Sequence, residues 1–188
     1  MCIRDSSEDG QPNLTSSHLF RYSEQFIKEY LPYTIELGRS FVRPEYQSSK
    51  MGAKSLFALD NLWDGLGALT LTIPNTKYFF GKATIYPSFN VNSRNCILSF
   101  LNKYFEDKDQ LALPRHLLDI KSEKEKWDSV LVGENYKEDY TILKSYVKET
   151  GNNIPPLINA YMTLSPTMRV FGSCINDEFG DVIETGLM

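Results

Sequence analysis

Residues 36–56 read ELGRSFVRPEYQSSKMGAKSL, and this stretch decides the predicted fold. Residues 34–42 have the pattern of a strand, and residues 52–69 repeat leucines at helical spacing. Glu36 and Arg39 put charges where a core strand would be apolar, with Gly38 between them. A regular strand would point these two side chains to opposite faces, whereas a bulge at Gly38 would bring them to the same face. The stretch therefore predicts a bulged strand that runs through a polar loop into a helix.

The polar loop, residues 46–55, leads to the predicted start of that helix. Backbone N–H groups at a helix start lack partners and lie at the positive end of the helix dipole, which favours a bound phosphate. Gly52 permits close approach of the backbone, and Lys50 and Lys54 add positive charge. Two interpretations stay open: a phosphate site, or a plain strand-to-helix turn with surface lysines.

The rest of the chain alternates strand and helix patterns. The predicted helices are 22–31, 93–105, 139–150 and 155–164, and the predicted strands are 77–86, 168–175 and 181–188, the last two joined by the turn NDEFGD. Residues 7–19 are polar and predict a loose lead-in. Residues 106–138 are charged and weakly periodic, and predict an insertion or lid that is partly helical, most simply a solvated excursion without a role. The fold class is mixed α/β (α+β), with a mostly antiparallel sheet flanked by helices.

Composition limits the function classes. With 188 residues, 41% of them hydrophobic, the chain predicts one globular domain. Its net charge of −4 argues against nucleic acid as the main partner. Two histidines and three cysteines without motif spacing argue against a metal site and for reduced thiols in a cytosolic protein. The first six residues, MCIRDS, resemble a translated sequencing adapter, so we expect a fragment of a bacterial gene from an environmental read, in which the natural N-terminus is lost and Cys2 is not a biological residue.

The loop sequence resembles that of a known superfamily. The pattern V-x-P-x-Y-Q-x-x-x-x-G-A, from Val42 to Ala53, is similar to the acyl-donor loop of the GNAT N-acetyltransferase superfamily. ELGRS resembles its hemolysin-like branch, which contains the ornithine lipid N-acyltransferases. YSEQF, KYFFGK, NIPPLINAYMTL and NDEFGD match later blocks of that branch, so the resemblance covers residues 20–188. The loop departs from the superfamily pattern in two ways, since it is longer between Gln47 and Gly52 and contains one glycine.

The resemblance implies roles for individual residues. Glu36 would act as general base or as an anchor for the acceptor ammonium, and Arg39 would bind the acceptor carboxylate or hold Glu36 by an ion pair. Asp177 would contact the acceptor, or cap its turn. The implied donor-binding residues are Val42, Gln47, Ser48, Lys50, Gly52, Ala53 and Gly81. Gly81 would give room for pantetheine, or allow close backbone packing.

Apolar residues nearby have two interpretations as well. Trp63 and the leucines of residues 52–69 are predicted to belong to the core in preference to an acyl pocket. Phe79 and Phe80 should point to opposite faces of the sheet, where one of them would line an acyl tunnel.

The resemblance also implies an activity. Members of this branch transfer a long, often hydroxylated acyl chain from acyl carrier protein to the α-amino group of an amino acid such as ornithine or glycine, for amino-lipid synthesis. A glycine-poor loop favours a phosphopantetheine-linked donor on acyl carrier protein over acyl-CoA, whose pyrophosphate needs a fuller nest of N–H groups. We expect a cytoplasmic enzyme with peripheral contact to the inner face of the membrane, without a metal or a tightly bound cofactor. The alternatives are an acyl-homoserine-lactone-type synthase and a non-enzymatic, hemolysin-like acyl-binding protein.

Overall fold

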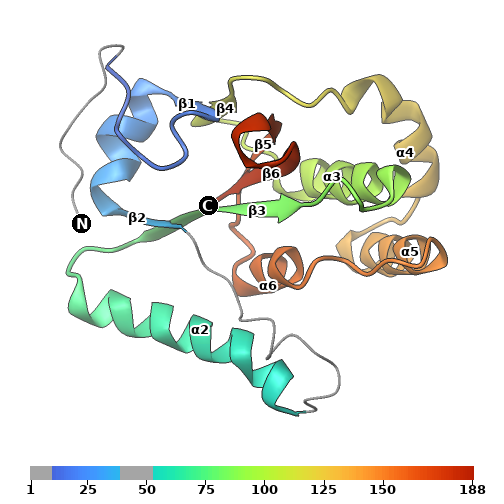
Figure 1. Cartoon of the computed structure of the whole chain (residues 1–188), viewed down its shortest axis with the longest axis horizontal. Coiled ribbons are helices and arrows are strands. Elements are labelled where there is room, and N and C mark those ends of the chain that lie inside the picture. The colour runs from blue at the N-terminus through green and yellow to red at the C-terminus, as the bar shows by residue number, and fades with distance from the viewer. Residues whose placement is uncertain (1–9, 39–52) are drawn as a thin grey trace.

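The computed structural model describes residues 10–38 and 53–188, with no side chains described for residues 53–60, 62 and 121. Figure 1 shows the arrangement of the elements. The described strands are β1 (Phe20–Tyr22), β2 (Thr34–Leu37), β3 (Tyr78–Ile85), β4 (Ala112–Pro114), β5 (Val170–Asn176) and β6 (Val182–Leu187). The described α-helices are α2 (Ala53–Thr72), α3 (Val91–Phe105), α4 (Lys124–Val130), α5 (Tyr136–Glu149) and α6 (Pro156–Leu164).

Two sheets organise the described residues. The larger has the strand order β2-β3-β6-β5, in which β2 and β3 are parallel and the other neighbours are antiparallel. The smaller pairs β1 with β4 in antiparallel fashion. The β2–β3 ladder is regular from Thr34↔Tyr78 to Leu37↔Gly81. This is the mostly antiparallel, GNAT-like α+β arrangement that the sequence predicts; the bulge predicted at Gly38 falls where the described part of β2 ends and stays a prediction.

The two faces of the larger sheet bury different cores. Ala83 and Ile85 of β3 belong to a cluster built with α3, α4, α5 and α6, the helical side seen in Figure 1. Phe80 belongs to a second, smaller cluster with β1, β4 and the π-helical turn Phe26–Tyr30. Odd-numbered β3 residues thus face the helices and even-numbered ones face β1 and β4, as strand alternation requires. Cys96 and Cys174 are buried free cysteines, one in each core.

Capping residues explain why several helices differ from their predicted bounds. Asn90 accepts a hydrogen bond from the Ser93 backbone, so α3 begins two residues earlier than apolar periodicity predicted. Asn135 caps α5 in the same way and moves its start to Tyr136. Gly151, at φ 77°, ends α5 as predicted. The helix predicted for residues 22–31 is instead one π-helical turn and a 3-10 turn, Leu31–Tyr33, because Pro32 cannot continue an α-helix.

Two segments are more ordered and buried than predicted, so the loose lead-in and the solvated excursion are wrong, while the partly helical character predicted for residues 106–138 is confirmed by α4. Residues 10–19 contribute Leu14 and Leu19 to the smaller core, and the Ser16 side chain is fully buried. Residues 106–138 contain β4 and α4 and place Trp127 in the larger core at 1% exposure. Residues 10–19 are mostly polar and uncharged and residues 106–138 are rich in charged side chains, yet in both segments the few apolar residues carry the packing. Neither segment is a solvated excursion.

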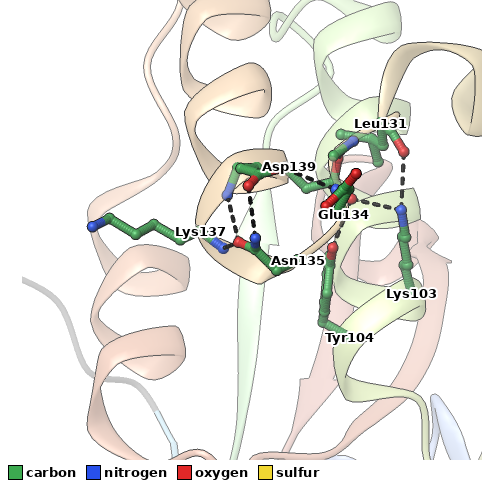
Figure 2. A network of polar contacts seen from close by, with 9 residues as sticks. Lys103, Tyr104, Leu131, Glu134, Asn135, Lys137 and Asp139 are labelled. Carbon is green, nitrogen blue, oxygen red and sulfur yellow. Dashed lines mark hydrogen bonds and ion pairs between the residues drawn. The ribbon is translucent and has the colours of Figure 1, made fainter.

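A buried carboxylate fastens the end of the second segment to α3. Asp139 of α5 is fully buried and accepts hydrogen bonds from Lys103 at 2.6 Å, from Tyr104 at 2.7 Å and from the Gly133 backbone at 2.6 Å (Figure 2). Lys103 also donates to the Leu131 carbonyl at 2.9 Å. Burial raises the pKa of Asp139, but the hydrogen bonds outweigh it and hold the pKa below its usual value. The network closes the α4–α5 connection onto α3.

Replacement of Asp139 by asparagine is expected to lower the free energy of unfolding by about 1–3 kcal/mol at neutral pH. A carboxylate whose pKa is lowered by folding stabilises the protein above its unfolded pKa, and this contribution is lost as the pH falls through the folded pKa. The wild type should therefore lose stability between pH 5 and the acid limit of folding, and the variant should lose less over this range. Urea unfolding at several pH values measures both. Equal acid slopes in the two proteins would contradict the assignment.

Candidate functional site

A cavity of about 590 Å³ lies at one end of the larger sheet, between α2 and α6. Its apolar lining includes Trp63, Leu66, Phe79, Tyr161, Leu164 and Met168. The volume falls in the range of about 300–1,000 Å³ that is usual for small-molecule sites. We call this space the apolar cavity. Its apolar walls suit an acyl chain.

Trp63 and Tyr161 form the part of the apolar cavity nearest to the middle of β3. Their rings meet edge to face, with centroids 5.3 Å apart. The Trp63 indole N–H is buried and has no hydrogen-bond partner among the described residues. Trp63 packs against the larger core and also lines the cavity, so its prediction as a core residue is right only in part.

The Tyr161 hydroxyl lies directly over Gly81. A Cβ placed on Gly81 would come within 2.5 Å of this oxygen and 3.5 Å of the Leu37 side chain. Gly81 therefore makes the close packing of α6 on β3 possible, and the hydroxyl occupies the space over it. Burial raises the pKa of Tyr161 to about 12, so the phenol is a neutral hydrogen-bond donor at physiological pH.

Glu36 lies on the other face of the same pair of strands. It is the β2 neighbour of Phe80, whose side chain belongs to the core on the β1–β4 side. Phe79, the residue before, lines the apolar cavity. The two phenylalanines thus point to opposite faces, as predicted, and Glu36 points away from the cavity.

A loop that precedes β1 holds the Glu36 carboxylate in place. Oε2 accepts from the Thr15 backbone N–H, and Oε1 accepts from the Ser16 backbone N–H, each at 2.9 Å. The Ser16 hydroxyl donates to Oε1 as well, so it must accept from the Tyr22 hydroxyl 2.7 Å away. Burial raises the pKa of Tyr22, which keeps its proton on the phenol. The chain Tyr22–Ser16–Glu36 fixes the orientation of the carboxylate.

The carboxylate has capacity for one further donor. An ionised carboxylate offers about four lone-pair positions, two on each oxygen. Ser16 uses two on Oε1 and Thr15 uses one on Oε2. Among the described residues one position on Oε2 is left. Glu36 is half-buried, so this position can meet a ligand that approaches from solvent.

Relatives of known name resemble nearly the whole chain. It is 59% identical over 181 residues, 96% of its length, to a protein of Phocaeicola vulgatus named Glycine N(alpha)-acyltransferase. It is similar to glycine N-acyltransferases. A second protein of that name, from Bacteroides thetaiotaomicron, is 57% identical over 181 residues. The chain spans 56% and 54% of the length of these two curated relatives. No family model matches the chain, and no solved structure matches it.

Most of the donor residues predicted from the loop lie outside the described residues. These are Val42, Gln47, Ser48, Lys50 and Gly52, together with the catalytic candidate Arg39. Ala53 is the first residue of α2, so the loop leads into a helix N-terminus as predicted. Their roles stay predictions.

Asp177 is not brought to Glu36. It is exposed at the turn between β5 and β6, beyond the Asn176↔Val182 pair. That turn adjoins the Ile85 end of β3, whereas Glu36 pairs near the Tyr78 end. Asp177 and Glu36 therefore lie toward opposite ends of β3, and this placement does not support a contact of Asp177 with an acceptor bound at Glu36.

Sequence reasoning missed Ser16, Tyr22 and Tyr161. Ser16 stands in a polar segment whose sequence has no periodicity, and Tyr22 and Tyr161 occur where any core aromatic would suit. Their roles come from contacts across 20 residues, from Ser16 to Glu36, and across 80 residues, from Gly81 to Tyr161. No local pattern encodes such contacts.

Proposed function

We propose that this chain is part of an N-acyltransferase that moves a long acyl chain from a thioester donor to the α-amino group of glycine. One observation carries the proposal: the Trp63, Phe79 and Tyr161 wall of the apolar cavity and the Glu36 carboxylate lie on opposite faces of the β2–β3 pair. A thioester placed beside the Leu37↔Gly81 pair would have its acyl chain on the helical face and its carbonyl within reach of an amine on the other face. The name of the two relatives supports glycine as the acceptor.

The reaction requires a neutral amine that is aligned with the thioester carbonyl carbon. The amine nitrogen forms a bond to the thioester carbonyl carbon, the carbon–sulfur bond breaks, and the thiolate leaves with the electron pair. One proton must leave the acceptor ammonium before attack, and a second leaves the nitrogen as the carbon–sulfur bond breaks and goes to the thiolate, which gives the amide and a free thiol. The open position on Glu36 Oε2 suits the first of these transfers, directly or through water, and the three donors that hold the carboxylate keep it aimed.

The donor is proposed to be an acyl group on the phosphopantetheine of acyl carrier protein, in preference to acyl-CoA. The single glycine of the loop before α2 supports this choice, because one phosphate needs fewer backbone N–H groups than a pyrophosphate. The product would be an N-acylated amino acid that serves amino-lipid synthesis at the inner face of the membrane. No helix of the described residues is long and apolar enough to cross a bilayer.

The test uses the full-length gene that contains this chain, expressed in a host that has acyl carrier protein but makes no amino lipids. Lipid extracts analysed by mass spectrometry are expected to contain N-acylglycine. Purified protein with acyl carrier protein or CoA donors then identifies the preferred donor. Absence of any new acylated amine, with the protein present and folded, would reject the proposed function.

Gly67 provides a test of the apolar cavity. It lines the cavity, and a Cβ placed there would meet nothing within 4 Å. Replacement of Gly67 by phenylalanine is expected to fill the cavity and lower kcat/KM for the longest acyl donors by about 10–100-fold relative to short ones, since each methylene that loses its pocket costs about tenfold or more. Gly65→Phe is the matched control, because Gly65 has the same open surroundings but does not line the cavity. An unchanged chain-length profile in Gly67→Phe would exclude the cavity as the acyl site.

A further inference from the structure

A polar cluster lies on the Glu36 face of the sheet, one step along the strands from Glu36. Lys82 and Thr84 follow Phe80 at alternate positions of β3, so all three share this face. Thr84 pairs with Glu184 of β6, and its hydroxyl donates to Glu184 Oε2 at 2.9 Å. Lys82 Nζ lies 3.9 Å from Glu184 Oε1. The cluster brings a cation next to a carboxylate on the two central strands of the larger sheet.

The Lys82 ammonium is only loosely partnered. Its distance of 3.9 Å to Glu184 exceeds that of a hydrogen bond. The exposed fractions of the two side chains are 19% for Lys82 and 5% for Glu184, so both charges are largely removed from water. An ammonium has three donors, and a partly buried one without good acceptors is costly. Among the described residues no closer acceptor for Nζ is present, which leaves donors for a ligand that enters from the exposed side.

Lys82 also lies at a suitable separation from Glu36. Glu36 is the β2 neighbour of Phe80, and Lys82 is two residues further along the adjacent parallel strand. Strand spacing of about 4.8 Å and a rise of about 3.3 Å per residue put the two Cα atoms roughly 8 Å apart, with both side chains on one face. Two long side chains that begin this far apart on one face can both reach a small molecule that lies between them.

We propose that Lys82 binds the carboxylate of the acceptor amino acid while Glu36 binds its amino group, which makes the site selective for zwitterionic α-amino acids over simple amines. The proposal rests on the proposed function and names its acceptor subsite. The opposite charges of Glu36 and Lys82 match the two ends of the acceptor. Thr84 donates to Glu184, and Glu184 lies beside the lysine without saturating its three donors. A charge-assisted hydrogen bond from an ammonium to a carboxylate is stronger than a neutral one, so loss of this contact should be felt mainly in acceptor binding.

The test compares glycine with glycinamide, which keeps the amine and lacks the carboxylate. The full-length protein is assayed with one acyl donor, and kcat/KM for each amine gives a preference ratio. The double variant Lys82→Met/Glu184→Gln removes the cation without stranding a buried carboxylate. Its preference ratio is expected to fall about 10–100-fold below that of the wild type, through a higher KM for glycine, with kcat/KM for glycinamide and the KM for the donor unchanged. The intrinsic reactivities of the two amines cancel in this comparison.

Two further variants control the measurement. Lys82→Arg keeps a cation and is expected to keep most of the preference for glycine. Lys108→Met removes an exposed lysine far along the chain and is expected to leave the ratio unchanged. Two results for a folded double variant would overturn the Lys82 assignment and leave the proposed function standing. One is a preference ratio equal to that of the wild type, and the other is an equal loss of activity toward both amines. A wild-type protein that acylates neither amine would reject the proposed function and this subsite with it. Should the double variant not fold, Lys82→Gln, which keeps a donor for Glu184, decides by the same ratio.

Discussion

Replacement of Glu36 by glutamine is expected to lower kcat/KM for glycine by about 10²–10⁴-fold, the usual contribution of a positioned general base. The amide oxygen can still accept from Ser16, but the amide NH₂ would stand where Oε2 stood. It would then face the Thr15 N–H and would offer the acceptor amine a donor in place of a lone pair. The variant therefore removes the proton acceptor and its charge while it keeps the shape of the side chain.

The measurement is steady-state kinetics of the full-length protein with glycine and an acyl donor, together with thermal unfolding. Glu24→Gln is the matched control, because Glu24 is an exposed acid whose carboxylate pairs with Lys28, and its loss should change neither property by much. Glu36 also organises the loop before β1, so a second variant separates the two roles. Ser16→Ala removes one donor to Glu36 and leaves the carboxylate in place. If Glu36 served only to hold that loop, Ser16→Ala would lower activity as much as Glu36→Gln; we expect a far smaller effect.

The sequence predicted those parts of the fold that local rules determine. α2 and α3 follow from apolar residues at helical spacing, and the β5–β6 hairpin follows from two short strands around NDEFGD. Glu36 stood out because a charge in a strand needs a reason. The burial of residues 10–19 and 106–138 was misjudged because it comes from a few apolar side chains that distant elements cover. Composition averages over a segment and so conceals such contacts.

The site was less predictable than the fold. The face of α2 that carries Trp63 and Leu66 has the pattern of a core helix, and the wall of an apolar cavity has the same pattern. Sequence periodicity tells which side of a helix avoids water, but not whether protein or ligand fills the space next to it. Lys82 was overlooked for a related reason, since a lysine in a strand usually marks an exposed edge, whereas β3 here lies between β2 and β6.

Replacement of Trp127 by alanine is expected to cost about 3–5 kcal/mol of unfolding free energy, as large-to-small changes of buried aromatic residues do. Trp127 is 1% exposed and packs edge to face on Tyr146 of α5, with ring centroids 5.9 Å apart. Its indole N–H donates to Glu123 at 3.0 Å, so the change also leaves an acceptor without that donor. At about 2–4 °C per kcal/mol for a protein of this size, the melting temperature should fall by roughly 10 °C.

Phe179→Ala is the control for the Trp127→Ala measurement. Phe179 is also aromatic but 61% exposed, so its replacement should change stability by less than about 0.5 kcal/mol. Denaturant unfolding of both variants, with a constant m-value, measures the difference directly. If residues 106–138 were an excursion that packs on nothing, the two replacements would be equally harmless. α4 instead supplies one of the largest fully buried side chains of the core that it shares with α3 and α5. We therefore expect the loss of Trp127 to weaken the whole helical layer that supports β3. This strand carries Lys82 and pairs with β2, the strand of Glu36.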